Sequence, residues 1–255
     1  MSYFLYDGRT IFYEEFGQGN VESILLLHGN TVSSKFFVPV IPILSEKYHV
    51  ITLDFLGNGQ SERIMNWPVD LWYEWSKQAA AVIRHLEIEK VNVIGCSGGA
   101  LAALNLALEE PELVKAVIAD SFEGLQANSE ITEQIRAGRE FAKQNEGFCS
   151  MLKMMHGDDW ENVLDADTNA VVNHALTVGS FCHKKISDLQ VMLLLTGSKE
   201  DEMFPSGHYS KLIDEMCGTT EFVKAHIFEQ GGHPAMMSNM DEFVSLADEF
   251  FGRNT

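Results

Sequence analysis

The sequence is poor in basic residues and in long apolar runs, and each shortage excludes a class of protein. Lys and Arg number 18 against 37 Asp and Glu, which gives a formal net charge of -19 over 255 residues. Nucleic acids and anionic membranes are polyanions, so neither is an expected partner for so acidic a chain. No apolar run approaches the roughly 18 residues that a membrane-spanning helix requires.

The N-terminus and the few cysteines predict a chain that works in the cytoplasm. The opening "MSYFLYDGRT" has no basic segment followed by an apolar one, so we expect no signal peptide. The cysteines form no C-x-x-C pair, which disfavours zinc and redox sites of that kind. We expect buried, free thiols in a reducing compartment. The four cysteines are Cys96, Cys149, Cys182 and Cys217.

Apolar runs that end at glycine alternate with runs at helical spacing through most of the chain. "SILLLHG", "KVNVIGCS" and "QVMLLLTGS" are continuous apolar runs, as in strands buried on both faces. "VDLWYEWSKQAAAVIRHLE" and "GGALAALNLALEE" predict helices. The alternation predicts an α/β fold, a mostly parallel, doubly wound sheet with helices on both faces. Two short alternating runs around Asp7-Gly8 predict an N-terminal β-hairpin.

Strand-like runs are missing between about residues 122 and 188. This segment contains "NSEITEQIRAGREFAKQNEGF" and "TNAVVNHALTVGSF", which predict helices, and nothing in it supplies another βαβ unit. No Gly/Ser-rich linker borders it. We therefore predict one domain over residues 1–255, with a helical cap inserted at about 122–188.

A single serine lies between a predicted strand and a predicted helix, in the segment "VIGCSGGA". The pattern is G-x-S-x-G, here Gly95, Cys96, Ser97, Gly98 and Gly99. A strand-to-helix turn this sharp needs strained backbone angles at its centre, and the glycines remove side chains that would clash. The turn would expose the Ser97 hydroxyl at a helix N-terminus, where developing negative charge is favoured. Ser97 is the predicted nucleophile.

A serine hydroxyl needs a base, and the base needs an acid to orient it. His233 lies in the glycine turn "QGGHPA" after the last predicted strand, and we predict that it is the base. Asp201 follows the strand "VMLLLTGS" and is the preferred acid, because the order Ser, acid, His then suits this architecture. Glu200 is a near competitor, and Asp120, at the end of "AVIADS", is a third alternative.

The tetrahedral intermediate of acyl transfer needs two N–H donors held in place. Gly98, the residue after the nucleophile, can supply one. The backbone of Asn30, directly after "LLLHG", can supply the other, with His28 bracing the loop. We therefore predict substrate contacts from Asn30 and Gly98.

Together these segments resemble the α/β-hydrolase superfamily, in its Ser-His-Asp branch. "LLLHGN" is similar to the family's oxyanion turn, and "GCSGG" and "GGHP" resemble its nucleophile elbow and histidine loop. "DFLGNGQS" resembles its D-x-x-G-x-G-x-S segment. The family's usual spacing from Gly197 would place the acid at Glu200, whereas alignment on Pro205 restores Asp201.

The resemblance implies hydrolysis of an ester, amide, thioester or carbon–carbon bond without metal or organic cofactor. We expect a serine hydrolase with an acyl-enzyme intermediate, a carboxylesterase on a small to medium apolar acyl substrate. The alternatives are a peptidase, a C–C bond hydrolase with the same triad, or a ligand-binding receptor on a hydrolase scaffold. "HGDDW" is only a weak metal signal, so we expect no metal. The partner is a small-molecule substrate, and the oligomeric state is not specified.

Overall fold

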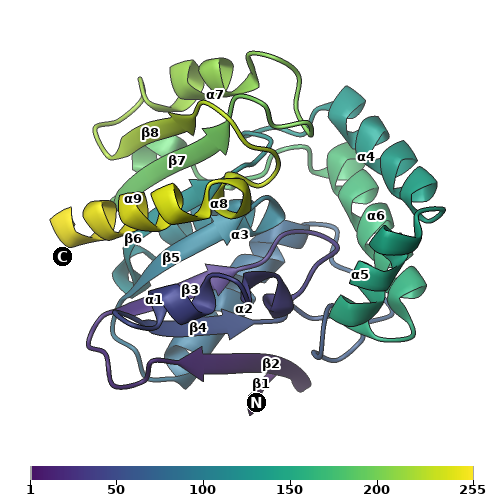
Figure 1. Cartoon of the computed structure of the whole chain (residues 1–255), viewed down its shortest axis with the longest axis horizontal. Helices are drawn as coiled ribbons and strands as arrows, with labels where there is room; N and C mark the ends of the chain where they lie inside the picture. The colour runs from purple at the N-terminus through teal and green to yellow at the C-terminus, as the bar shows by residue number, and fades with distance from the viewer. Residues whose placement is uncertain (1, 255) are drawn as a thin grey trace.

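Eight strands form one sheet in the computed structural model, which describes residues 2–254 (Figure 1). The strand order is β1-β2-β4-β3-β5-β6-β7-β8, and the strands from β4 to β8 in that order are parallel. This arrangement confirms the predicted α/β fold class. The strands are β1 (Ser2–Tyr6), β2 (Arg9–Phe16), β3 (Ser23–Leu27), β4 (His49–Leu53), β5 (Val91–Cys96), β6 (Val114–Asp120), β7 (Met192–Ser198) and β8 (Val223–Phe228).

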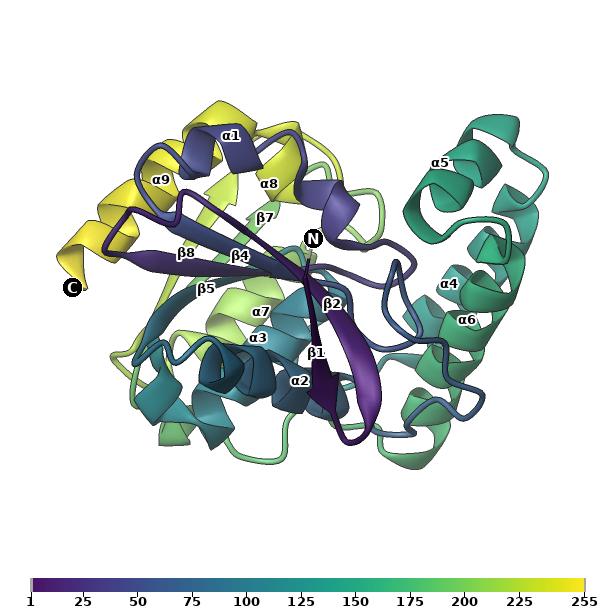
Figure 2. The ribbon, with the colours of Figure 1, turned by 90° about the horizontal axis from the view of Figure 1, so that it is seen from below.

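Helices cover both faces of the sheet, as Figure 2 shows from below. On one face lie α2 (Leu71–His85), α3 (Gly98–Glu109) and α7 (His208–Met216). On the other lie α1 (Ile41–Leu44), α8 (Ala235–Ser238) and α9 (Met240–Arg253). Within residues 2–254 no helix is long and apolar enough to cross a membrane.

The first two strands form the predicted antiparallel hairpin at one edge of the sheet. Asp7 and Gly8 both have positive φ angles, 49° and 75°, as a tight two-residue turn requires. β2 also pairs antiparallel with β4. β2 therefore runs opposite to the other strands, and the hairpin adds two antiparallel pairings to an otherwise parallel sheet.

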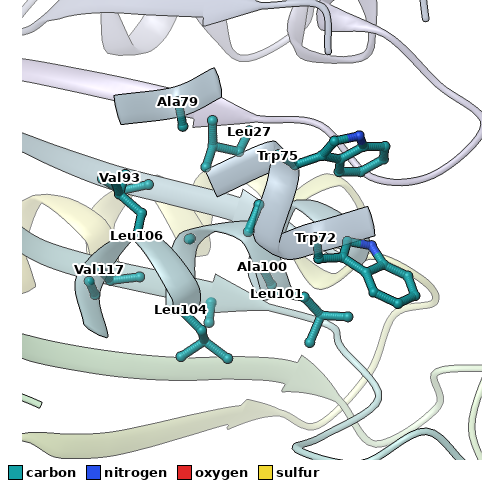
Figure 3. Packing of buried hydrophobic residues seen from close by; sticks show 14 of the residues in the cluster. Leu27, Trp72, Trp75, Ala79, Val93, Ala100, Leu101, Leu104, Leu106 and Val117 are labelled. Atoms are coloured by element: carbon teal, nitrogen blue, oxygen red, sulfur yellow. The ribbon is translucent and has the colours of Figure 1, made fainter. Parts of the chain in front are cut away.

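The central strands and α3 are apolar on all sides because the fold buries them on all sides. Every residue of β3 and β5 is buried, as is every residue of α3 from Gly98 to Leu108. Figure 3 shows this layer, with Trp75 of α2, Leu106 of α3 and Val93 of β5 in one cluster. A buried helix needs no polar face, which explains the run of Ala and Leu after the serine.

Three helices follow β6 in the chain and lie beyond the carboxyl ends of the parallel strands (Figure 1). We call them the cap helices: α4 (Ser129–Ala142), α5 (Glu146–His156) and α6 (Trp160–Thr177). The single helix predicted across "NSEITEQIRAGREFAKQNEGF" is wrong, because the chain breaks between α4 and α5. The Asn145 side chain accepts a hydrogen bond from the Phe148 N–H and so starts a new helix.

Helix α6 begins eight residues before the helix that the sequence predicts at Thr168. Its buried positions include Val163, Leu164 and Val171, but also the polar residues Asp167 and His174. Because Asp167, a core-facing position of its first half, is polar, the apolar periodicity there is weak. The contacts of Asp167, described below, stabilise the longer helix.

The cysteines differ in part from the expectation of buried thiols. All four are free, and Cys96 and Cys182 are buried. Cys149 and Cys217 are only partly buried, since they lie on α5 and just after α7, at the surface of the molecule.

Candidate active site

The serine turn is built from close backbone contacts that only glycine permits. Ser97 has φ 55° and ψ -123°, between the last residue of β5 and the first residue of α3. A Cβ at Gly95 would lie 2.2 Å from the carbonyl oxygen of Gly99. A Cβ at Gly99 would lie 2.1 Å from the carbonyl oxygen of Leu27. The glycines therefore allow α3 to start directly over the sheet with the serine at its tip.

Replacing Gly99 by alanine should disrupt this turn. Backbone atoms of Leu27 and His28 occupy the space of the new Cβ, so the strand and helix must move apart. Overpacking of this kind costs about 1–3 kcal/mol, and we expect a lower melting temperature together with loss of hydrolysis. Gly252→Ala is the control, because nothing lies within 4 Å of its Cβ position. Equal melting temperatures for the two variants would contradict the close-contact argument.

His233 and Asp201 are brought together at the carboxyl ends of β7 and β8. The Nδ1 atom of His233 lies 3.0 Å from Oδ2 of Asp201. Because the carboxylate only accepts, Nδ1 carries the proton and Nε2 keeps its lone pair. The side chain of Asp201 is almost completely buried, whereas that of His233 is 14% exposed. The pair can therefore act as an oriented base.

Two further donors hold the Asp201 carboxylate. The Tyr209 hydroxyl donates to Oδ2 at 2.6 Å, and the Met203 N–H donates to Oδ1 at 3.0 Å. Burial by itself would raise the pKa of Asp201, but His233 and these donors outweigh burial and hold that pKa below its usual range. The Tyr209 ring also explains Gly197, whose Cβ would lie 2.3 Å from the ring. The sequence offered no signal for Tyr209.

The two alternative acids lie elsewhere. Glu200 is exposed. Asp120 is fully buried at the end of β6, where it accepts hydrogen bonds from the Thr196 hydroxyl at 2.7 Å and the Met236 N–H at 2.9 Å. Asp120 thus ties the segment after His233 to the sheet, and burial raises its pKa. Only Asp201, of the three candidates, contacts the His233 ring.

A cavity of about 740 Å³ lies between the sheet and the cap helices, and four of the five predicted site residues line it. They are Asn30, Ser97, Gly98 and His233. Among residues 2–254, no hydrogen bond joins the Ser97 hydroxyl to His233, although both face this cavity. A smaller cavity of about 310 Å³ opens between α4 and α6 and contains none of the predicted site residues.

Backbone and side-chain contacts fix the two predicted oxyanion donors. Gly98 is the first residue of α3, where N–H groups have no acceptor within the helix. The loop that carries Asn30 is braced by His28, which is fully buried. His28 donates from Nδ1 to the Gly29 carbonyl at 2.8 Å and accepts the Phe55 N–H at Nε2 at 3.1 Å.

The remaining cavity wall is mostly apolar and is shared between the cap helices and the loops and helices of the core. Of the three methionines that the sequence places in "MLKMM", Met151 lines the cavity, Met154 is exposed, and Met155 is buried in the core. Residues that the sequence reasoning missed include Phe204 and Glu202, whose carboxylate accepts the His233 N–H at 3.1 Å. Their loop, after β7, has no periodic pattern that could have indicated them.

Glu123 is an ionisable residue of the cavity that no motif indicated. It follows β6, and its carboxylate accepts the Asn128 N–H at 2.6 Å. Burial raises the pKa of Glu123 to about 7, and the Asn128 N–H only partly offsets that effect. Its charge therefore changes in the neutral range.

Glu123→Gln should make the protein more stable at pH 8 and leave its stability at pH 5 nearly unchanged. A carboxyl whose folded-state pKa is raised stabilises the fold below its ordinary pKa of 4.5. That contribution is lost as the pH rises from about 4.5 to about 7, at a cost of about 3 kcal/mol. Urea unfolding at the two pH values measures the difference. Exposed Glu89→Gln is the control, and an equal gain for both variants would contradict the argument.

The "HGDDW" segment joins the cap to the core. His156 accepts the Gly59 N–H at Nδ1, 2.9 Å away, and so donates from Nε2 to the Thr31 carbonyl at 3.0 Å. Asp159 forms an ion pair with Arg63. In the described part of the chain, no group of three or more His, Cys, Asp or Glu side chains is arranged to hold a metal ion.

Comparison with known proteins places this chain in a family. The sequence profile described as the alpha/beta hydrolase fold matches residues 22–150, just over half of the chain. The serine hydrolase BPHL of Mus musculus is 25% identical over 253 residues, which cover 96% of this chain and 84% of that protein. The 2-hydroxymuconate semialdehyde hydrolase of Pseudomonas sp. (strain CF600) is 26% identical over 236 residues, 83% of this chain and 79% of that protein.

A solved structure supports the fold assignment. The serine hydrolase CCSP0084 of Cycloclasticus zankles superposes with a TM-score of 0.75 at 22% identity, covering 98% of this chain and 97% of that one. At this level of identity the likeness concerns the fold alone. Together with the profile match and the strand order, it leads to one conclusion: the chain belongs to the alpha/beta hydrolase fold family.

Proposed function

We propose that this protein is a serine hydrolase in which Ser97 is the nucleophile, His233 the base and Asp201 the acid. The observation that carries the proposal is the shared cavity: Ser97 and His233 line it together, and His233 is held by buried Asp201 at 3.0 Å. The proposed enzyme is one domain over residues 1–255, with the segment at about 122–188 as an inserted cap.

In the first step the Ser97 Oγ atom attacks the carbonyl carbon of the substrate while Nε2 of His233 takes the hydroxyl proton. Asp201 stabilises the resulting imidazolium and keeps its Nδ1 proton in place. Catalytic hydrogen bonds often tighten only with substrate present, so we expect the Ser97–His233 contact to form in the substrate complex. His233 then gives its proton to the leaving group.

The negative oxygen of the tetrahedral intermediate would lie between the N–H groups of Asn30 and Gly98. After the leaving group departs, an acyl group stays bound to Ser97. Water, deprotonated by His233, attacks this ester, and His233 then returns the proton to the departing Ser97 oxygen as the acid is released. No step requires a metal or an organic cofactor.

The cavity supports a carboxylesterase that accepts small to medium apolar acyl groups. Its cap wall carries apolar side chains, including Ile135, Phe148 and Met151, and its volume of about 740 Å³ suits a ligand of modest size. Burial of an apolar acyl chain against such a wall contributes favourable binding free energy.

Hydrolysis of a carbon–carbon bond is the second candidate, and one comparison favours it. The relative from Pseudomonas sp. is named as a 2-hydroxymuconate semialdehyde hydrolase and aligns over 83% of this chain. The same nucleophile, base and oxyanion donors could act on a ketone.

Two measurements test the proposal. A fluorophosphonate should label Ser97, which peptide mapping would show. Activity on p-nitrophenyl esters of increasing chain length, set beside activity on 2-hydroxymuconate semialdehyde, separates the two candidate reactions. Absence of labelling in the folded protein would overturn the serine mechanism for both.

A further inference from the structure

A buried carboxylate of the cap contacts the loop that carries a proposed oxyanion donor. Asp167, on α6, has a side chain with no exposed surface. Its Oδ2 accepts a hydrogen bond from the Asn30 side-chain Nδ2 at 2.9 Å. Its Oδ1 lies 2.7 Å from a guanidinium nitrogen of Arg139, on α4, whose side chain is 15% exposed. One carboxylate therefore joins two cap helices to the loop after β3.

The other end of the Asn30 amide is held from the core. The indole N–H of Trp72, on α2, donates to Oδ1 of Asn30 at 3.1 Å. A carboxylate can only accept and an indole N–H can only donate, so a flipped Asn30 amide would lose both hydrogen bonds. The orientation of the Asn30 side chain is thus fixed by its two partners.

The same amide lies directly against the second proposed oxyanion donor. A Cβ at Gly98 would lie 2.0 Å from Oδ1 of Asn30 and 2.6 Å from the indole nitrogen of Trp72. The Asn30 side chain therefore fills the space beside Gly98. The two residues proposed to supply the oxyanion N–H groups contact each other through this one side chain.

The loop needs such contacts to keep its shape. Thr31, next to Asn30, has φ 64°, a conformation that non-glycine residues rarely adopt. Its carbonyl accepts a hydrogen bond from the cap residue His156 at 3.0 Å. The two cap contacts fall on consecutive residues of the loop, one on the Asn30 side chain and one on the Thr31 backbone.

We propose that Asp167 is a positioning residue: through the Asn30 amide it sets the Asn30 N–H at the distance from Gly98 that the oxyanion requires. This inference rests on the proposed function. Asp167 does not touch the reacting atoms. It makes the oxyanion hole depend on how the cap helices pack against the sheet.

The test uses the full-length protein, a p-nitrophenyl ester and phenylboronic acid. The Ser97 oxygen adds to boron and forms a tetrahedral anion, the two boron hydroxyls remain, and the serine proton passes to His233. Asp167→Leu, which offers no acceptor to the Asn30 amide, should lower kcat and the affinity for phenylboronic acid about tenfold to a hundredfold, because a displaced oxyanion donor weakens binding of the anion. KM for the ester should change less than about threefold, since the acyl wall is untouched.

A double-mutant cycle with Asn30→Ala separates positioning from general damage to the fold. If Asp167 acts through Asn30, the double variant should lose about as much kcat as Asn30→Ala alone. The proposal would be overturned if the kcat losses of the two single variants multiply in the double variant. It would also be overturned if the Asp167 variant changes only the melting temperature or KM. Lys35→Met is the matched control, because Lys35 also donates to the cap, at the Met154 carbonyl 2.7 Å away, but without Asn30. It should keep kcat.

Asp167→Leu leaves Arg139 without its carboxylate, so a second variant guards against misfolding. Arg139→Gln combined with Asp167→Leu removes both charges and the acceptor for Asn30, and should show the same loss of kcat and boronate affinity. Wild-type affinity in that folded variant would refute the positioning role. Failure of the wild type itself to take the fluorophosphonate or the boronic acid would instead refute the serine mechanism, and the positioning role with it.

Discussion

Ser97→Ala should lower kcat by roughly 10⁵- to 10⁶-fold and leave the fold intact. The variant removes the only atom that we propose to attack the substrate, so just binding and oxyanion stabilisation remain. The Cβ atom is kept, and alanine can occupy the backbone conformation that Ser97 already holds at φ 55°. Steady-state hydrolysis of a p-nitrophenyl ester, with melting temperature measured in parallel, gives both quantities.

Ser187→Ala is the control for this experiment, because Ser187 is an exposed serine outside the cavity. It should hydrolyse the ester at the wild-type rate. Wild-type turnover by the Ser97 variant would show that the elbow does not carry the chemistry. A chelator should change the hydrolysis rate of neither the wild type nor the Ser187→Ala variant. Activity that disappears with chelator and returns with zinc would point to a metal hydroxide in place of the serine.

Asp201→Asn should lower kcat about 10⁴-fold, by analogy with other triads. An amide in this position can donate to the Nδ1 atom of His233, which would move the ring proton to Nε2 and leave no base for Ser97. In the wild type the Tyr209 hydroxyl and the Met203 N–H both donate to the Asp201 carboxylate. The Asp201→Asn variant is therefore also expected to lose some folding stability. Rates are therefore compared at a temperature where all variants are folded.

Glu200→Gln and Asp120→Asn complete the comparison. Glu200 is exposed and its substitution should leave the rate near the wild-type value. Asp120→Asn weakens the hydrogen bond from the Met236 N–H. Its loss of kcat should therefore be smaller than that of Asp201→Asn and should accompany a lower melting temperature. The largest loss of kcat at Asp120 would move the acid to the end of β6.

The sheet and the family of the chain could be predicted from sequence because the residue patterns that indicate them are local. Strands such as "SILLL" are apolar throughout since they are covered on both faces, and "GCSGG" carries glycines where backbones touch. Both kinds of pattern are visible without knowing the partners. The predicted membership of the α/β-hydrolase superfamily is confirmed by the profile match over residues 22–150.

The parts that the sequence did not predict depend on partners far away in the chain. Tyr209 reaches Asp201 from α7, and Glu202 accepts the His233 N–H from a loop without periodicity. The start of α6 was missed because Asp167 faces the core with a polar group. A buried carboxylate is stable there only because Arg139 and Asn30 satisfy it, and neither is near it in sequence.

The position of the cap helices in the chain has a consequence for exchanging them between related proteins. They leave the sheet after β6 and return at β7, two strands that pair with each other, so a donor segment of another length could join the same two points. Such chimaeras would be expected to fold. Yet a transplanted cap without an acceptor for the Asn30 amide would leave its NH2 group without a partner, and only Trp72 would then hold that side chain beside Gly98. Grafts designed for new substrates should therefore carry the Asp167–Arg139 pair with them, or replace Asn30 at the same time.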